Sequence, residues 1–105
     1  MFIIQKTPTY DAWIKRLRDR RAAGRITSRI LRAEDGNLGD VKPVAQGVSE
    51  MRINYGPGYR VYFLQRGAVV ILLLCGGDKR HQDKDIERAK EYFQDYQKRA
   101  TETGH

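Results

Sequence analysis

The sequence predicts a single α+β domain in which helices pack on an antiparallel sheet. Three observations favour this class. Helical periodicity dominates the first third of the chain and its C-terminal region, whereas the middle consists of short segments that alternate apolar and polar residues. Glycine-rich turns separate these segments, which favours antiparallel pairing of successive strands. A chain of 105 residues is long enough for one modest core.

Two helices are expected near the N-terminus, after a short β-like segment over residues 1–6. Thr7 can cap the first helix, and Pro8 suits its first turn. The two apolar stripes predict helices over about 8–18 and 20–34, paired as a hairpin. We expect Trp13 to be a core residue rather than a stacking platform, because it lies on the first stripe. That stripe consists of Tyr10, Trp13, Ile14 and Leu17.

Three strands are expected in the middle of the chain, after a loop over residues 34–47. Residues 48–55 and 59–66 alternate in polarity on either side of the turn sequence GPG. Residues 68–75 are apolar on both faces and predict a central strand. Cys75 ends that run, so a buried structural thiol is expected there rather than a nucleophile.

A last helix is expected from about Asp83, which completes a strand, two helices, a three-stranded meander and a helix. Residues 1–98 are predicted to form the domain, and residues 99–105 a flexible tail. The longest apolar run has eight residues, against roughly 20 for a membrane helix, and we expect no signal peptide. The single Cys excludes an internal disulfide and suits a reducing compartment, so a cytoplasmic protein is expected.

The positive charge is concentrated in one segment. Residues 15–32 contain eight of the 20 basic residues and one acidic residue, so this segment carries the whole net charge of +7. Such a local excess fits a polyanion or an acidic protein partner, although a solvated helix face would give the same pattern. The RNA-contacting candidates in this segment are Arg16, Arg20, Arg21 and Arg25.

Several classes of site are missing from the sequence. No Cys/His cluster has metal-ligand spacing, and the two His residues lie 24 positions apart. The GGDK sequence lacks the longer loop of a phosphate-binding Walker motif, and no dinucleotide-binding fingerprint or Ser–His–Asp arrangement is present. We therefore expect neither a metal nor a cofactor.

A polar set on the predicted sheet is the remaining candidate site. The pleat places Met51, Ile53, Val61 and Phe63 toward the helices, and the alternate positions on the opposite, open face. Lys79 follows the third strand and can reach that face. Such a set could hold a phosphodiester and cleave RNA without a metal, through the 2′-hydroxyl. The alternative is a solvated face on which Glu50 and an Arg only aid solubility. The polar set consists of Glu50, Arg52, Arg60 and Tyr62.

The sequences GVSEMRINYGPGYRVYF and LLLCGGDKRHQDKDIERA resemble the RelE/ParE toxin superfamily, and most closely its HigB-like addiction module killer proteins. The resemblance extends from about Phe2 to Tyr96. It implies a cytoplasmic toxin of a type II toxin–antitoxin pair, with a helical hairpin and a C-terminal helix on an antiparallel sheet. RelE-like members cleave mRNA in the ribosomal A site, whereas ParE-like members poison DNA gyrase.

The resemblance also implies roles for individual residues. Arg60, in the GPGYR motif, becomes the first candidate for a phosphate-contacting residue in a metal-independent endoribonuclease. Arg52 and Lys79 follow, and Glu50 can orient them. Tyr62 is a candidate RNA contact, and His81 a candidate acid or base, because imidazoles titrate near neutral pH; a solvated loop histidine is the alternative for His81.

The expected partners follow from the same resemblance. They are the ribosome with its mRNA, and a cognate antitoxin that is a small helix-turn-helix protein and binds operator DNA in the toxin–antitoxin complex. The basic helix can contact ribosomal RNA or receive this antitoxin. A gyrase inhibitor and a non-catalytic binding module that has lost toxicity remain alternatives.

Overall fold

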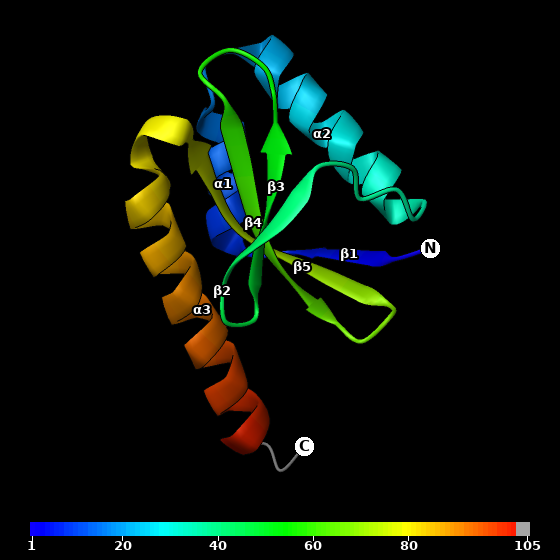
Figure 1. The fold of residues 1–105 in the computed structure, drawn as a ribbon, viewed down its shortest axis with the longest axis vertical. Coiled ribbons are helices and arrows are strands. Elements are labelled where there is room, and N and C mark those ends of the chain that lie inside the picture. Colours follow the sequence, from blue (N-terminus) through cyan, green and yellow to red (C-terminus); the bar gives the residue numbers. More distant parts are fainter. Residues whose placement is uncertain (103–105) are drawn as a thin grey trace.

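The chain forms a five-stranded sheet with helices on both faces (Figure 1). The structure, a computed structural model, describes residues 1–102, and their side chains as far as Arg99. The elements are β1 (Ile3–Lys6), α1 (Pro8–Arg16), α2 (Arg20–Glu34), β2 (Val41–Ala45), β3 (Val48–Ile53), β4 (Tyr59–Arg66), β5 (Val70–Asp78), the 3-10 turn η1 (Lys79–His81) and α3 (Gln82–Glu102).

The sheet is mixed rather than purely antiparallel. Its strand order is β1-β5-β4-β3-β2, with β1 parallel to β5 and every other pair antiparallel. The α+β class and the antiparallel meander of β3, β4 and β5 are as predicted. The meander is only part of the sheet, because β1 extends it on one side and β2 on the other.

The expected loop over residues 34–47 contains a strand, so that prediction was wrong in part. β2 pairs with β3, placing Val41 opposite Met51 and Lys42 opposite Glu50. Pro43 lies in this strand, which is possible because β2 is at the edge of the sheet and no outer neighbour needs its missing N–H. An edge strand interrupted by proline therefore resembles a loop in sequence.

One face of the sheet packs against α1 and α2. Met51, Ile53, Val61 and Phe63 lie in this cluster with Ile26 of α2, so the predicted helix-facing set is confirmed. Each of these five residues is at most 4% exposed. Burial on this scale stabilises the fold by about 1.5–3 kcal/mol per large aliphatic or aromatic side chain.

The other face is covered by α3, which corrects the expectation of an open face. Ala89 and Tyr62 are completely buried there, together with Leu74 and Cys75. The strand register shifts between Tyr62 and Phe63, which brings the consecutive residues Leu74 and Cys75 into this one cluster. In Figure 1, α3 descends along this face, whereas α1 lies behind the sheet.

The helix ends follow local chemistry. Asp19 accepts hydrogen bonds from two backbone amides at the start of α2 and so caps this helix. Both ends of α2, Arg20 and Glu34, are as predicted. α1 ends at Arg16, two residues earlier than expected. α3 continues through residues 99–102 of the expected tail, and residues 103–105 lie outside the described part of the chain. None of the described helices is long and apolar enough to span a bilayer.

Candidate active site

The centre of the candidate site is an ion pair between Glu50 on β3 and Arg60 on β4. Arg60 Nε lies 3.6 Å from Glu50 Oε2, and the two side chains are 12% and 2% exposed. Gln82, the first residue of α3, donates a hydrogen bond to the same oxygen at 3.0 Å. A buried carboxylate is costly unless it is paired and hydrogen-bonded, which Glu50 is. Arg60 Nε has no hydrogen-bond partner among the described residues, and its Nη1 donates to the Tyr59 carbonyl at 3.3 Å.

The GPG turn brings the backbone of Lys79 to Gly58, which also lies beside Arg60. A β-carbon at Gly58, which has φ +84°, would lie 3.5 Å from Arg60 Nη1 and 3.6 Å from Lys79 Cβ. The Lys79 amide also donates to the Gly58 carbonyl at 2.7 Å. We call Glu50, Arg60, Lys79 and Gln82 the Arg60 cluster. Gly58 therefore has both the Arg60 guanidinium and the β-carbon of Lys79 as neighbours.

Arg52 lies directly opposite Arg60 in the register of the two strands, but it has a separate partner. Its Nη2 and Nε donate to Asp40 Oδ1 at 2.8 and 3.2 Å. This hydrogen bond lowers the pKa of the Asp40 carboxyl and raises that of Arg52. Both side chains are exposed, at 37% and 57%, so an incoming phosphate can compete with Asp40 for Arg52.

His81 lies in η1 and is tied to Asp78. Its Nδ1 is 2.9 Å from Asp78 Oδ1, and its side chain is 61% exposed. Burial alone would raise the pKa of Asp78, but hydrogen bonds from His81 and Arg80 lower it overall. The contact orients the imidazole, and the exposed ring can meet a substrate.

The Tyr62 side chain is buried and cannot contact RNA, which corrects its assignment as an RNA contact. It is completely buried, and burial raises the pKa of its hydroxyl. Glu50 shares this buried face, so it can act only through Arg60 or Gln82. The pleat correctly placed both residues on the face opposite α1 and α2, but α3 covers that face.

Two residues of the site were missed from the sequence. Gln82 supports Glu50, and Asp85 is buried against Gly77 with its Oδ2 lacking a hydrogen-bond partner among the described residues. Burial raises the pKa of Asp85. Both residues belong to the pattern GGDK…Q…DI, and their spacing at the start of a helix was the signal that could have identified them.

The four basic candidates of the helices do not form one cluster. Arg20 Nη1 donates to the Leu17 carbonyl at 3.0 Å and so caps the C-terminal end of α1. Arg25 stacks over Tyr55, 4.7 Å from the ring centroid. Arg21 is exposed on α2, and Arg16 is exposed on α1. The basic surface therefore extends along both helices, with Arg20 partly occupied by a structural role.

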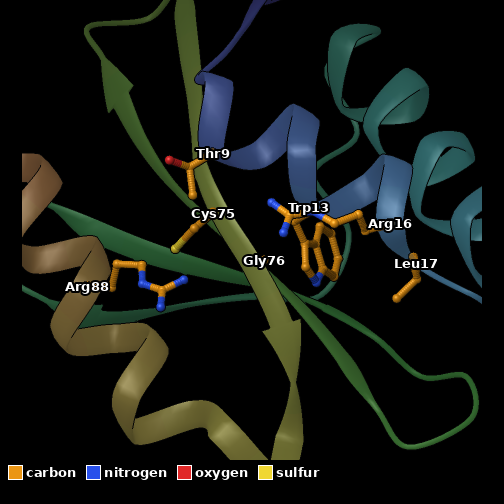
Figure 2. A pocket seen from close by; sticks show the side chains of 7 residues that line it. All are labelled: Thr9, Trp13, Arg16, Leu17, Cys75, Gly76 and Arg88. Carbon is orange, nitrogen blue, oxygen red and sulfur yellow. The ribbon is translucent and has the colours of Figure 1, made fainter.

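A separate pocket of about 280 Å³ lies between α1, β5 and α3 (Figure 2). Cys75, at its floor, is 1% exposed, as expected for a structural thiol, and burial raises its pKa to about 12. Trp13 packs against the core, as predicted, but also lines this pocket. Its lining residues are Thr9, Trp13, Arg16, Leu17, Cys75, Gly76 and Arg88. We call it the Trp13 pocket.

No three His, Cys, Asp or Glu side chains in the described part of the chain gather as potential metal ligands. The titratable side chains of the Arg60 cluster are two cations and one carboxylate that is already paired. This composition suits an anionic ligand.

We compared the chain with known proteins and protein families. No family model matches the chain. A Haemophilus influenzae protein, described as an uncharacterized protein, is 49% identical over 87 residues, which are 83% of this chain and 88% of that protein. Identity at this level over most of both chains establishes common membership, and the chain therefore belongs to the same protein family as this Haemophilus influenzae protein.

Proposed function

We propose that this protein is the toxin of a type II toxin–antitoxin pair and cleaves mRNA on the ribosome in the cytoplasm. The observation that carries the proposal is the placement of Arg60. Its guanidinium forms an ion pair with the buried Glu50, and it shares Gly58 as a neighbour with the β-carbon of Lys79. This arrangement, the RelE/ParE-like sequence motifs and the basic segment 15–32 all favour a polyanionic substrate.

The proposed reaction is an attack within the RNA strand. The 2′-oxygen bonds to phosphorus while the bond from phosphorus to the 5′-oxygen breaks. The products carry a 2′,3′-cyclic phosphate and a 5′-hydroxyl. One proton leaves the 2′-hydroxyl and one joins the 5′-oxygen, so the step balances without a cofactor.

Arg60 and Lys79 stabilise the negative charge that grows on the phosphate oxygens. A guanidinium that is already oriented costs little reorganisation during the reaction, and removal of one such group typically lowers rates by about 10²–10³-fold. Glu50 and Gln82 act as positioning residues, because Glu50 is buried and touches Arg60 rather than the substrate. His81 is the proposed proton donor or acceptor, oriented by Asp78.

The proposed partners share the basic surface of α1 and α2. Ribosomal RNA would be bound there by phosphate contacts, which give affinity without reading sequence. The cognate antitoxin, proposed to be a small helix-turn-helix protein, would neutralise the toxin and carry the complex to its operator DNA. Arg21 and Arg25, both exposed on α2, are the residues for either contact.

The test is controlled expression followed by mapping of transcript ends. The wild-type protein should arrest growth and produce mRNA fragments with 2′,3′-cyclic phosphates. Arg60→Ala should lower the cleavage rate by about 10²-fold or more. Arg66→Ala removes the same charge from the far end of β4 and should cleave normally. Arg60→Lys keeps a cation beside Glu50 and separates loss of chemistry from loss of folding.

The same experiment distinguishes the alternatives. Intact mRNA with loss of DNA supercoiling would replace this proposal with a ParE-like gyrase inhibitor. Normal growth with the wild-type protein and with both Arg60 variants would identify a binding module without toxicity. Cleavage that is unaffected by Arg60→Ala would remove Arg60 from the reaction.

A further inference from the structure

The Trp13 pocket lies where the edge of β5 loses its neighbour. β1 pairs with β5 only as far as Lys6 opposite Leu73. Beyond that point α1 flanks one face of β5 and α3 the other, with Gly76 between them (Figure 2). The result is a hollow open to solvent whose walls come from two helices that are distant in sequence.

Gly76 allows the indole of Trp13 to lie directly on the strand. A β-carbon at position 76 would collide with the indole, reaching 2.6 Å from its Cη2. Tyr10 and Tyr59 contact the same indole, with ring centroids 5.9 and 6.4 Å away. The ring is therefore held in one place, and it remains partly exposed where it lines the pocket.

Two arginines line this pocket, one on each side of β5. Figure 2 shows Arg16 of α1 and Arg88 of α3 directed toward the pocket on either side of Cys75 and Gly76. Within the described part of the chain, Arg88 has no hydrogen bond or ion pair, although Asp85 lies close enough to influence it electrostatically. Arg16 only donates through Nε to the Ala12 carbonyl, at 3.3 Å, so both guanidinium groups have donors left for a ligand.

We propose that the Trp13 pocket binds one nucleotide of single-stranded RNA. The base stacks on Trp13, which any base can do because every base has an aromatic face. Arg16 and Arg88 bind the flanking phosphates by charge-assisted hydrogen bonds. A volume of about 280 Å³ lies near the lower end of small-molecule pockets, roughly 300–1,000 Å³, and suits one nucleotide rather than a folded partner.

This inference rests on the proposed function, which identifies the bound polymer as RNA. The pocket adds a second contact between the protein and RNA, besides the Arg60 cluster. Gly76 forms the pocket floor, and the next residue, Gly77, pairs with Arg60 across the sheet. Because consecutive residues of a strand face opposite sides of the sheet, Trp13 at Gly76 and the Arg60 cluster at Gly77 lie on opposite faces of β5. A bound RNA strand would pass the edge of β5 beyond the end of β1 to contact both, and anchoring it there would raise its local concentration at the Arg60 cluster without taking part in the reaction.

An acidic peptide is the competing occupant, because the free edge of β5 could also pair with an extended chain. A peptide strand would bind mainly through main-chain hydrogen bonds to the edge of β5, and an aromatic ring would contribute little to its binding. A fixed Trp13 ring in a pocket that is also lined by two arginines favours the nucleotide, since stacking together with cations is the pattern of single-strand binders.

Trp13 is the single tryptophan of the chain, so its fluorescence reports on the pocket directly. Titration with adenosine 5′-monophosphate at low salt should quench this emission saturably, and inorganic phosphate should compete. Arg88→Ala should weaken binding roughly tenfold or more, as expected for a charged hydrogen bond. Lys98→Ala makes the same charge change about 15 Å away along α3 and should bind like wild type.

The outcomes separate this inference from the proposed function. Saturable quenching with an Arg88 dependence supports the pocket even if the protein cleaves no RNA, which would refute only the nuclease. Arg66→Ala, which removes a cation at the far end of β4, should leave the affinity for the mononucleotide unchanged, because Arg66 is not in the pocket lining. Equal affinities of Arg88→Ala and Lys98→Ala would overturn the inference. Quenching by a hexaglutamate peptide but not by the nucleotide would assign the pocket to an acidic peptide instead.

Discussion

The carboxyl group of Asp85 lies against the backbone of Gly77. A β-carbon at position 77 would collide with Asp85 Oδ2 and lie 2.8 Å from Asp85 Cγ. The first turn of α3 can therefore rest on β5 only because residue 77 has no side chain. Gly76 likewise leaves room for the indole of Trp13 on the opposite face. The two consecutive glycines therefore allow helices to approach both faces of one strand.

Gly77→Ala should destabilise the fold by about 1–3 kcal/mol, because the added methyl group overpacks a contact that cannot move freely. Gly24→Ala is the matched control. Position 24 lies in α2 with no atom near its missing β-carbon, so alanine there should stabilise by roughly 0.5–1 kcal/mol through helix propensity. Urea denaturation measures both. Equal stability of Gly77→Ala and wild type would show that α3 shifts without cost.

Replacing Asp85 by Asn should change the pH dependence of stability. Burial raises the pKa of Asp85, so the folded state binds its proton more tightly than the unfolded state does. The resulting stability is complete below the ordinary carboxyl pKa of about 3.9 and is lost as pH rises through the raised value. Asp85→Asn should therefore gain stability relative to wild type as pH increases. Unfolding measured at several pH values checks this, and the same pH dependence in Asp85→Asn and wild type would refute the assignment.

The sequence was sufficient for those parts of the fold that depend on local pattern. α2 was predicted with its observed bounds because its apolar stripe is regular. β2 was missed because Pro43 and the surrounding glycines are typical of a loop, and pairing with β3 is a tertiary property. The parallel pairing of β1 with β5 joins residues more than 60 positions apart, which no local pattern encodes.

The candidate site was predictable where it depends on the strand pleat. Alternation placed Glu50, Arg60 and Tyr62 on one face, and this is confirmed. Periodicity shows which residues share a face but not what covers it, so the burial of Glu50 and Tyr62 under α3 could not be inferred. The contacts of Gln82 with Glu50 and of Asp40 with Arg52 bridge separate elements and were missed for the same reason.

Thr7 joins the start of α1 to β5 and should be sensitive to loss of its hydroxyl. Its Oγ1 donates to the Leu74 carbonyl at 2.6 Å and accepts from the Tyr10 amide at 3.1 Å. Thr7→Val keeps the shape but loses both bonds, and should cost about 1–3 kcal/mol. Thr7→Ser keeps the hydroxyl and should lose much less in the same thermal and urea unfolding measurements. Similar losses in the two variants would mean that packing of the methyl group, not the cap, matters here.

Glu50 and Arg60 should show strong energetic coupling. Removal of either partner leaves the other charge buried, so Glu50→Ala and Arg60→Ala should each destabilise by about 3–5 kcal/mol. The double variant should lose less than the sum of the two, by roughly 0.5–3 kcal/mol, because no unpaired charge remains. Chemical denaturation of all four proteins gives this coupling. Additive losses would show that the pair does not hold Arg60 in place, and would leave its orientation toward a phosphate without structural support.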